Sequence, residues 1–212
     1  MLDSNSARRI VIGPEERSGW SSERPREGRK AHSQNRARVL SPAAELYYAP
    51  RSLLVVCSAT PEIRLKFLQR FFSAQQIISQ RRIEAFLGGS VDSKDLGAAA
   101  KQLMHAAISR RLQAGQSTVI APLELFVDER EDLTKIAHQY KRTAHLIVLD
   151  AGRQAVGDEN LFAQLAALRA AARSGEVGSE GFRTALVLGR ADVDRLQAVF
   201  FIDPRERVQR DY

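Results

Sequence analysis

The chain of 212 residues has room for one full hydrophobic core, and its 44% hydrophobic content is ordinary for a globular protein. Its formal net charge of +7 favours an acidic partner such as nucleic acid. The single cysteine, Cys57, excludes an internal disulfide framework and a cysteine-rich metal site, so we expect the cytoplasm or another reducing intracellular compartment. The N-terminal sequence has no apolar run, and no stretch approaches the roughly 20 apolar residues of a membrane span, so we expect neither secretion nor membrane insertion.

Residues 1–51 are predicted to form an extended basic arm of largely irregular structure. They are rich in Arg, Ser, Glu, Gly and Pro and show neither a helical nor a strand period. Two apolar features, the patch "RRIVIG" at residues 8–13 and Trp20, would either anchor the arm on a partner or pack on the protein's own sheet. The segment Ser41–Pro50, "SPAAELYYAP", is expected to form one short helical turn.

Six cations in the arm form a predicted polyanion-binding set: Arg24, Arg26, Arg29, Lys30, Arg36 and Arg38. Such a local excess can neutralise several phosphates of a nucleic acid. No base-reading motif or aromatic stacking array accompanies it, so the contact would be insensitive to base sequence. The alternative is a solvated tail whose arginines only keep it soluble.

Short apolar strands alternate with amphipathic helices over residues 52–203. The apolar runs of strand length lie at 53–57, 117–121, 145–150 and 184–189. Helices are expected at 61–73, 92–112, 128–140, 158–173 and 191–200, the second of them ended by Gly115. Strands separated by helices of this length predict the α/β class, with a three-layer parallel sheet and helices on both faces. Residues 204–212 are expected to form a C-terminal tail.

Three longer segments carry a family resemblance. They read "IISQRRIEAFLGG" from Ile77, "STVIAPLELFVDEREDLTKIAHQYKRTAHLIVLD" from Ser117 and "SEGFRTALVLGRADVDRL" from Ser179. In order and spacing, residues 53–201 resemble the P-loop kinase domain of bacterial polynucleotide kinases and of related AAA-type small kinases. The resemblance implies a P-loop NTPase-like fold, with these segments as its second strand and turn, its third to fourth strands, and its last strand and closing helix.

The phosphate-binding loop of that family is altered in this chain. A phosphate cradle has the spacing G-x-x-x-x-G-K-[ST]. The corresponding residues here are Ser58 and Ile63 for the glycines, Arg64 for the lysine and Leu65 for the hydroxyl. Without glycines the backbone cannot close around a phosphate, and without the hydroxyl Mg²⁺ loses a ligand. We therefore expect no nucleotide cofactor; ATP with Mg²⁺ is the alternative.

The acceptor side of the resemblance is altered as well. After the second strand the family places an aspartate that activates the substrate hydroxyl and, three residues later, an arginine that binds phosphate. The chain has Gln80 and Ile83 there, although Arg81 or Arg82 becomes available at a shifted register. An amide has no useful basicity, so the predicted general base is missing.

Three further residues are candidates only if the protein is active. Arg130 matches an arginine of the family, Asp150 ends the Walker B-like strand "LIVLD", and Arg153 is the candidate arginine finger of a shortened lid. The alternative interpretations are a salt-bridging residue, a turn cap and a solvated loop arginine, respectively. The histidines have no metal-ligand spacing with one another or with Cys57, so no metal site is expected.

The sequence thus predicts a pseudo-kinase without catalytic residues, acting as a structural or binding subunit of a larger, nucleic-acid-containing assembly. Its partners would be other proteins of that assembly and a polyanion bound by the arm. One alternative is an active, polynucleotide kinase-like phosphotransferase that uses Arg64, Arg130, Asp150 and Arg153. Another is a regulatory paralogue of an active kinase.

Overall fold

The computed structural model describes residues 36–122 and 125–202, which belong to one compact unit. Several predictions fall outside the described residues: the "RRIVIG" patch, Trp20, the C-terminal tail and four of the six arm cations, Arg24, Arg26, Arg29 and Lys30. Among the described helices, none is long and apolar enough to cross a membrane.

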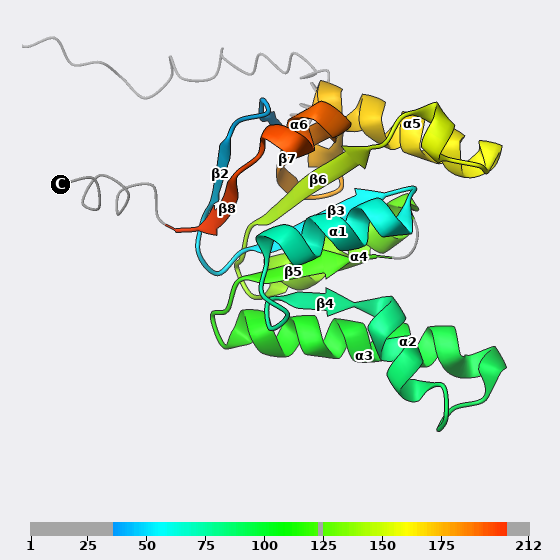
Figure 1. Cartoon of the computed structure of the whole chain (residues 1–212). Helices are drawn as coiled ribbons and strands as arrows, with labels where there is room; N and C mark the ends of the chain where they lie inside the picture. Colours follow the sequence, from blue (N-terminus) through cyan, green and yellow to red (C-terminus); the bar gives the residue numbers. More distant parts are fainter. Residues whose placement is uncertain (1–35, 123–124, 203–212) are drawn as a thin grey trace, which may run out of the picture. The chain divides into compact units, whose positions relative to one another are not determined.

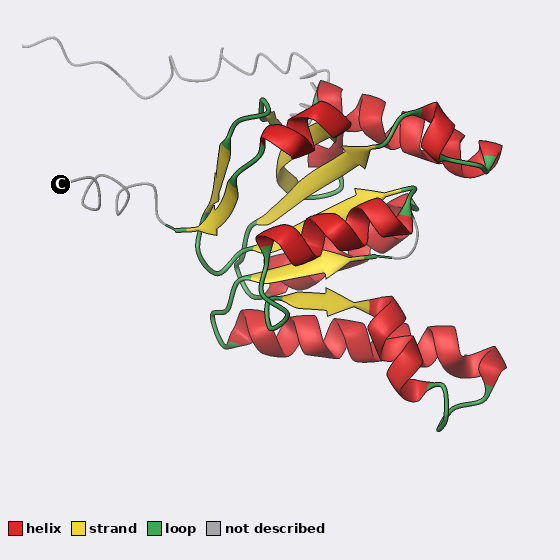
Figure 2. Cartoon of the chain, viewed as in Figure 1, coloured by secondary structure: helices red, strands yellow, loops and turns green. Residues whose placement is uncertain are grey.

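A six-stranded parallel sheet lies at the centre of the fold (Figures 1 and 2). Its strands in spatial order are β1 (Arg38–Val39), β7 (Phe182–Gly189), β6 (Ala144–Asp150), β3 (Leu53–Ser58), β5 (Thr118–Ala121) and β4 (Ile77–Ser79). Every neighbouring pair is parallel. The central strand β3 is fully buried, as its continuous apolar sequence predicts.

Helices cover both faces of this sheet, so the predicted fold class is confirmed. One face carries α3 (Ser93–Gln113), α4 (Val127–Gln139) and α5 (Glu159–Ser174), and the other carries α1 (Pro61–Phe71), α6 (Arg190–Arg195) and the parallel pair β2 (Glu45–Tyr48) and β8 (Ala198–Phe201). Successive side chains of β3 serve the two cores in turn. Leu53 and Val55 pack in the core under α3–α5, whereas Leu54 and Val56 pack in the core under α1.

Helix boundaries follow local sequence signals. The Asp158 carboxylate accepts hydrogen bonds from Asn160 N (2.8 Å) and Leu161 N (3.1 Å) and so caps the start of α5. Gly175 ends the same helix with a φ of 78°. A proline at the first position of α1 fits there because that residue has no helical hydrogen bond to donate.

Two predicted elements are wrong. The expected helical turn in 41–50 is strand β2, which pairs with β8; its Leu46 and Tyr48 alternate with more exposed residues and pack in the core under α1. The helix expected over 191–200 ends at Arg195, and the aromatic segment that follows is strand β8. Two elements were not predicted: helix α2 (Gln80–Leu87) and edge strand β1, whose two residues lie inside the segment assigned to the arm.

Candidate functional site

The junction between β3 and α1 is where the phosphate loop would lie. Strand β3 ends at Ser58 and α1 begins at Pro61, so only two residues connect them. Ile63, Arg64 and Leu65 are consequently helical. The Ser58 hydroxyl accepts a hydrogen bond from Thr60 N (3.1 Å) and donates one to Thr60 O (3.3 Å), which ties the connection to itself.

The backbone of this junction lacks the shape of a phosphate nest. Such a nest needs successive N–H groups in alternating right- and left-handed conformations. Thr60 is extended, with φ −111° and ψ 104°. Among the described residues, positive φ values occur at Arg51, at Lys141 and at four glycines, all of them outside residues 58–65. Helix α1 starts at Pro61, within the stretch where such a cradle would lie.

Arg64 stands at the position of the phosphate-binding lysine, but its side chain is held inside the fold. It is 6% exposed, and its guanidinium donates a hydrogen bond to the carbonyl of Pro122 in the loop after β5. Burial, and then the charge of Arg81, hold the pKa of Arg64 below its usual value, against the opposite influence of Cys57 and Glu129. The neighbouring Leu65, at the hydroxyl position, is 53% exposed.

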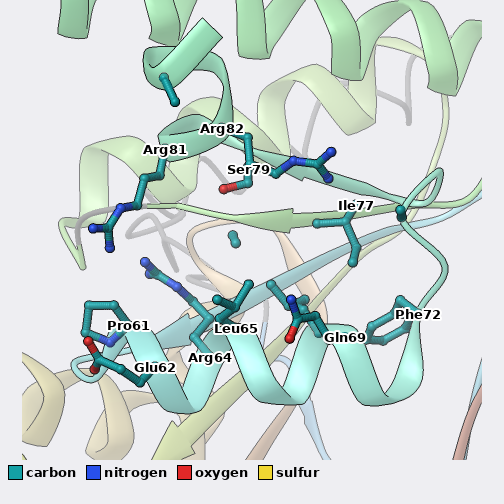
Figure 3. A pocket seen from close by; sticks show the side chains of 14 residues that line it. Pro61, Glu62, Arg64, Leu65, Gln69, Phe72, Ile77, Ser79, Arg81 and Arg82 are labelled. Atoms are coloured by element: carbon teal, nitrogen blue, oxygen red, sulfur yellow. The ribbon is translucent and has the colours of Figure 1, made fainter.

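A cavity of about 770 Å³ lies between α1 and the β4–α2 segment (Figure 3). Arg64 from α1 and Arg81 and Arg82 from α2 line it, so the shifted-register arginines do reach this space. Leu65, Phe72 and Ile77 are among its apolar lining residues. The arrangement can attract an anion with an apolar body.

The two residues at the expected acceptor position, Gln80 and Ile83, make contacts within the fold. Gln80 is buried, and its Nε2 donates a hydrogen bond to Glu84 Oε1 at 3.1 Å. Ile83 packs against the core under α3. Among the described residues that line the cavity, Glu62 is the one carboxylate, and it lies in the first turn of α1.

Asp150, at the end of the Walker B-like strand, is held by neighbouring groups. Its Oδ2 lies 2.7 Å from Arg169 Nη1, and its Oδ1 accepts a hydrogen bond from Gly152 N at 3.1 Å. Partial burial opposes ionisation, but the hydrogen bonds and the charges of Arg169 and Arg173 outweigh it and keep the pKa of Asp150 below its usual range. Within the described residues, no group of three or more His, Cys, Asp or Glu side chains is placed to hold a metal ion.

The other two candidates lie in ion pairs. Arg130 Nε and Nη2 each lie 2.7 Å from a carboxylate oxygen of Glu180, and the arginine is 3% exposed. Arg153 Nη2 lies 2.9 Å from Glu159 Oε1, with both side chains exposed. Asp150 lines a separate cavity of about 490 Å³ between α1 and α6. The structure therefore does not gather the four candidates in one cavity.

The predicted polyanion-binding set reaches the described fold at Arg36 and Arg38. Both line a cavity at the opposite edge of the sheet, where β6 and β7 begin. Sequence reasoning missed the cations that join them there, Lys141, Arg142 and Arg183. The sequence did carry a signal for them, because Lys141 and Arg142 lie just before the strand "AHLIVLD" and Arg183 is the second residue of the strand "FRTALVLG".

Comparisons with known proteins found likenesses among solved structures only. No family model and no curated protein sequence matches the chain. A structure described as a "putative kinase" from Chloroflexus aurantiacus is 15% identical, covers 77% of this chain and 94% of its own, and has a TM-score of 0.42. The tunicamycin resistance protein of Deinococcus radiodurans is 12% identical, covers 66% of this chain and 86% of its own, and has a TM-score of 0.37. Likenesses at this level say nothing about activity.

Proposed function

We propose that this protein is a catalytically degenerate, P-loop kinase-like protein that serves as a binding or structural subunit of a larger, nucleic-acid-containing assembly. The observation that carries the non-catalytic part is the two-residue connection between β3 and α1. A connection this short, with Thr60 extended and Pro61 lacking an N–H, offers too few backbone donors to enclose a phosphate.

The placement of the remaining candidates supports the same proposal. Phosphoryl transfer depends on positioned charge, with metal, lysine and arginine converging on one phosphoryl group. Here Arg64 donates to a backbone carbonyl, Asp150 pairs with Arg169, and Arg130 pairs with Glu180. Each group is engaged in holding the fold together, so none of the three is free to follow a substrate through a reaction.

An active phosphotransferase is a second candidate because of one observation. Arg64, Arg81 and Arg82 converge on a single cavity, which is the kind of cationic site that an anionic acceptor would occupy. The two candidates differ in whether ATP with Mg²⁺ binds at the start of α1.

Calorimetry with ATP and Mg²⁺ distinguishes these candidates. We expect no saturable heat up to millimolar ATP. The variant Glu62→Gln removes the negative charge from the first turn of α1, where it would repel a phosphate, so any binding there would become tighter in this variant. The matched control is Glu176→Gln, an exposed carboxylate distant in sequence from the junction. Saturable binding that Glu62→Gln strengthens and Arg81→Ala weakens, together with phosphate transfer, would establish the phosphotransferase instead.

The assembly part of the proposal needs a separate experiment. The tagged full-length protein is recovered from extract of its native source with and without nuclease treatment. We expect it to co-purify with nucleic acid and with a constant set of proteins, part of which is lost after nuclease treatment. Recovery of the protein alone under both conditions would contradict an assembly role, but would not contradict the proposal that the protein is non-catalytic.

A further inference from the structure

A basic cavity of about 670 Å³ lies at the amino-terminal edge of the sheet, opposite the β3–α1 junction. Five of its lining residues are cations: Arg36, Arg38, Lys141, Arg142 and Arg183. None of its described lining residues is a carboxylate. A concave surface lined by one sign of charge concentrates the field of that charge and attracts ions of the opposite sign.

Three segments that are distant in the sequence bring these cations together. Lys141 and Arg142 follow the end of α4, where Lys141 N donates to His138 O (2.9 Å) and Lys141 adopts a φ of 55°. Arg183, the second residue of β7, lines the same cavity. Arg38 arrives on edge strand β1, which pairs with β7 in the register Arg38 to Thr184.

Two glycines allow the close approach of these segments. Gly175 has a φ of 78°, and a Cβ there would lie 2.6 Å from the carbonyl oxygen of Ala37, whose N–H donates to Gly175 O at 2.8 Å. Gly181 has a φ of 102°, and a Cβ there would lie 2.8 Å from His138 Cε1. These backbone contacts hold the residue before β1 and the end of α4 close to the loop between α5 and β7. The position of these segments therefore does not depend on the charges of the cavity.

Three of the exposed cations of the cavity, Arg38, Lys141 and Arg183, lack counter-ions within the described structure. Arg38, Lys141 and Arg183 are exposed, and none of them forms an ion pair with any residue of 36–122 or 125–202. Like charges gathered in this way repel one another, and a partner with closely spaced negative charges relieves that repulsion.

We propose that this cavity binds the phosphodiester backbone of nucleic acid, with Arg38, Lys141 and Arg183 each facing a phosphate. This proposal adds to the proposed binding role the surface that binds and the chemical group that is bound. It rests on the proposed function only in taking nucleic acid as the partner. Because the contacts are with phosphates, binding is independent of base sequence. The cations of residues 24–30 precede this surface in the chain and carry the same charge.

Fluorescence anisotropy with a labelled mixed-sequence DNA duplex tests the proposal on the full chain. The variant is Lys141→Gln/Arg183→Gln, and the matched control is Lys94→Gln/Arg110→Gln, which removes two exposed cations from α3. We expect the cavity variant to lose at least about tenfold in affinity at about 0.1 M salt and to lower the salt slope by about 1.8, and the control to change affinity less than about twofold. An equal loss in both variants, or none in either, overturns the proposal.

Three further measurements keep the result interpretable. Circular dichroism melts establish that both variants fold, and Arg38→Gln, which leaves α4 and β7 intact, repeats the test if the double variant does not. A labelled single-stranded RNA of equal length tells which nucleic acid is preferred. Unlabelled polyaspartate that displaces the duplex at equal charge concentration overturns the proposal in favour of an acidic protein.

The same proteins separate this inference from the proposed function. Saturable ATP binding with the cavity effect intact contradicts only the non-catalytic reading. Absence of both ATP binding and the cavity effect contradicts only the nucleic-acid surface.

Discussion

Two arginines at each edge of the sheet differ in how their side chains are held. At the carboxyl edge Arg64 donates to Pro122 O, and Arg169 pairs with Asp150. At the amino edge Arg38 and Arg183 are exposed and make no ion pair with the described residues. At the carboxyl edge Arg64 and Arg169 are bound internally, although Arg81 and Arg82 nearby are exposed. At the amino edge Arg38 and Arg183 are both presented to solvent.

This difference separates charge that stabilises the fold from charge that is available to a partner. A buried guanidinium must be matched by acceptors in the fold, because an uncompensated buried charge is strongly destabilising. An exposed one contributes little to stability and keeps its hydration until a partner replaces it. Net charge alone, the quantity read from composition, does not distinguish the two cases.

The largest expected effect is on the buried ion pair of Arg130 and Glu180. Arg130→Met leaves the Glu180 carboxylate, 9% exposed, without its bidentate partner, and should lower the free energy of unfolding by about 3–5 kcal/mol. The double variant Arg130→Met/Glu180→Met should lose much less, because no unpaired charge remains. Urea unfolding of the single and double variants measures both values.

The matched substitution at the amino edge is Arg183→Met. Since Arg183 is exposed and makes no ion pair with the described residues, the free energy of unfolding should change by no more than about 0.5 kcal/mol. A loss at Arg183 comparable to that at Arg130 would show that the two edges do not differ as described.

A pH-dependent effect of intermediate size is expected at His145, near the start of β6. Burial and then the charge of Arg183 lower the pKa of His145 from 6.5 to about 4. Its Nδ1 lies 2.8 Å from Thr184 Oγ1, and its ring lies 4.9 Å from that of Tyr48. The folded protein therefore holds the imidazole neutral at pH values where the unfolded chain protonates it.

The sign of the effect follows from that difference. The contribution of His145 is complete above about pH 6.5 and is lost as the pH falls toward 4, with a maximum loss of about 3 kcal/mol. His145→Gln should flatten this part of the profile. Urea unfolding of both proteins at several pH values between about 4.5 and 7 provides the comparison, and parallel profiles would contradict it.

The sequence predicted the framework because the framework depends on local patterns. The apolar runs at 53–57 and 145–150 correspond to strands β3 and β6, and Asp158 and Gly175 lie at the ends of α5. Strand β1 could not be found in this way, because a two-residue strand has no period and exists only through its pairing with β7.

The candidate site shows where sequence reasoning reached its limit. Substitution of the loop glycines was readable at Ser58 and Ile63, and the helix expected over 61–73 starts at Pro61 as predicted, but the extended conformation of Thr60 is a property of the backbone. The sequence predicted only part of the basic cavity: it indicated Arg36 and Arg38, but not Lys141 or Arg183. Arg38, Lys141 and Arg183 lie at least 42 positions apart in the sequence, so no local window contains any two of them.

A smaller effect is expected from restoring glycine at the β3–α1 junction. Ser58 is buried in β3 and exchanges hydrogen bonds with Thr60, and no residue between 58 and 65 has a positive φ. Ser58→Gly should lower the free energy of unfolding by about 1 kcal/mol, because glycine loses more backbone entropy on folding. Ile63→Gly, inside α1, should lose more. A higher melting temperature in either variant would indicate a junction still shaped for phosphate.

The smallest expected effect is the response of stability to Mg²⁺, which tests Asp150 directly. Asp150→Asn weakens a partly exposed ion pair with Arg169 and should lower the free energy of unfolding by about 1 kcal/mol. A ligand that binds only the folded state at ten times its Kd would add about 1.4 kcal/mol. Because Arg169 and Gly152 N already occupy the two oxygens of Asp150, about 10 mM Mg²⁺ in place of EDTA should leave the melting temperature of wild type and variant unchanged. If Mg²⁺ instead stabilises the wild type and Asp150→Asn abolishes that gain, then the carboxylate exchanges Arg169 for the metal. That result would show that the carboxyl edge binds Mg²⁺ through Asp150.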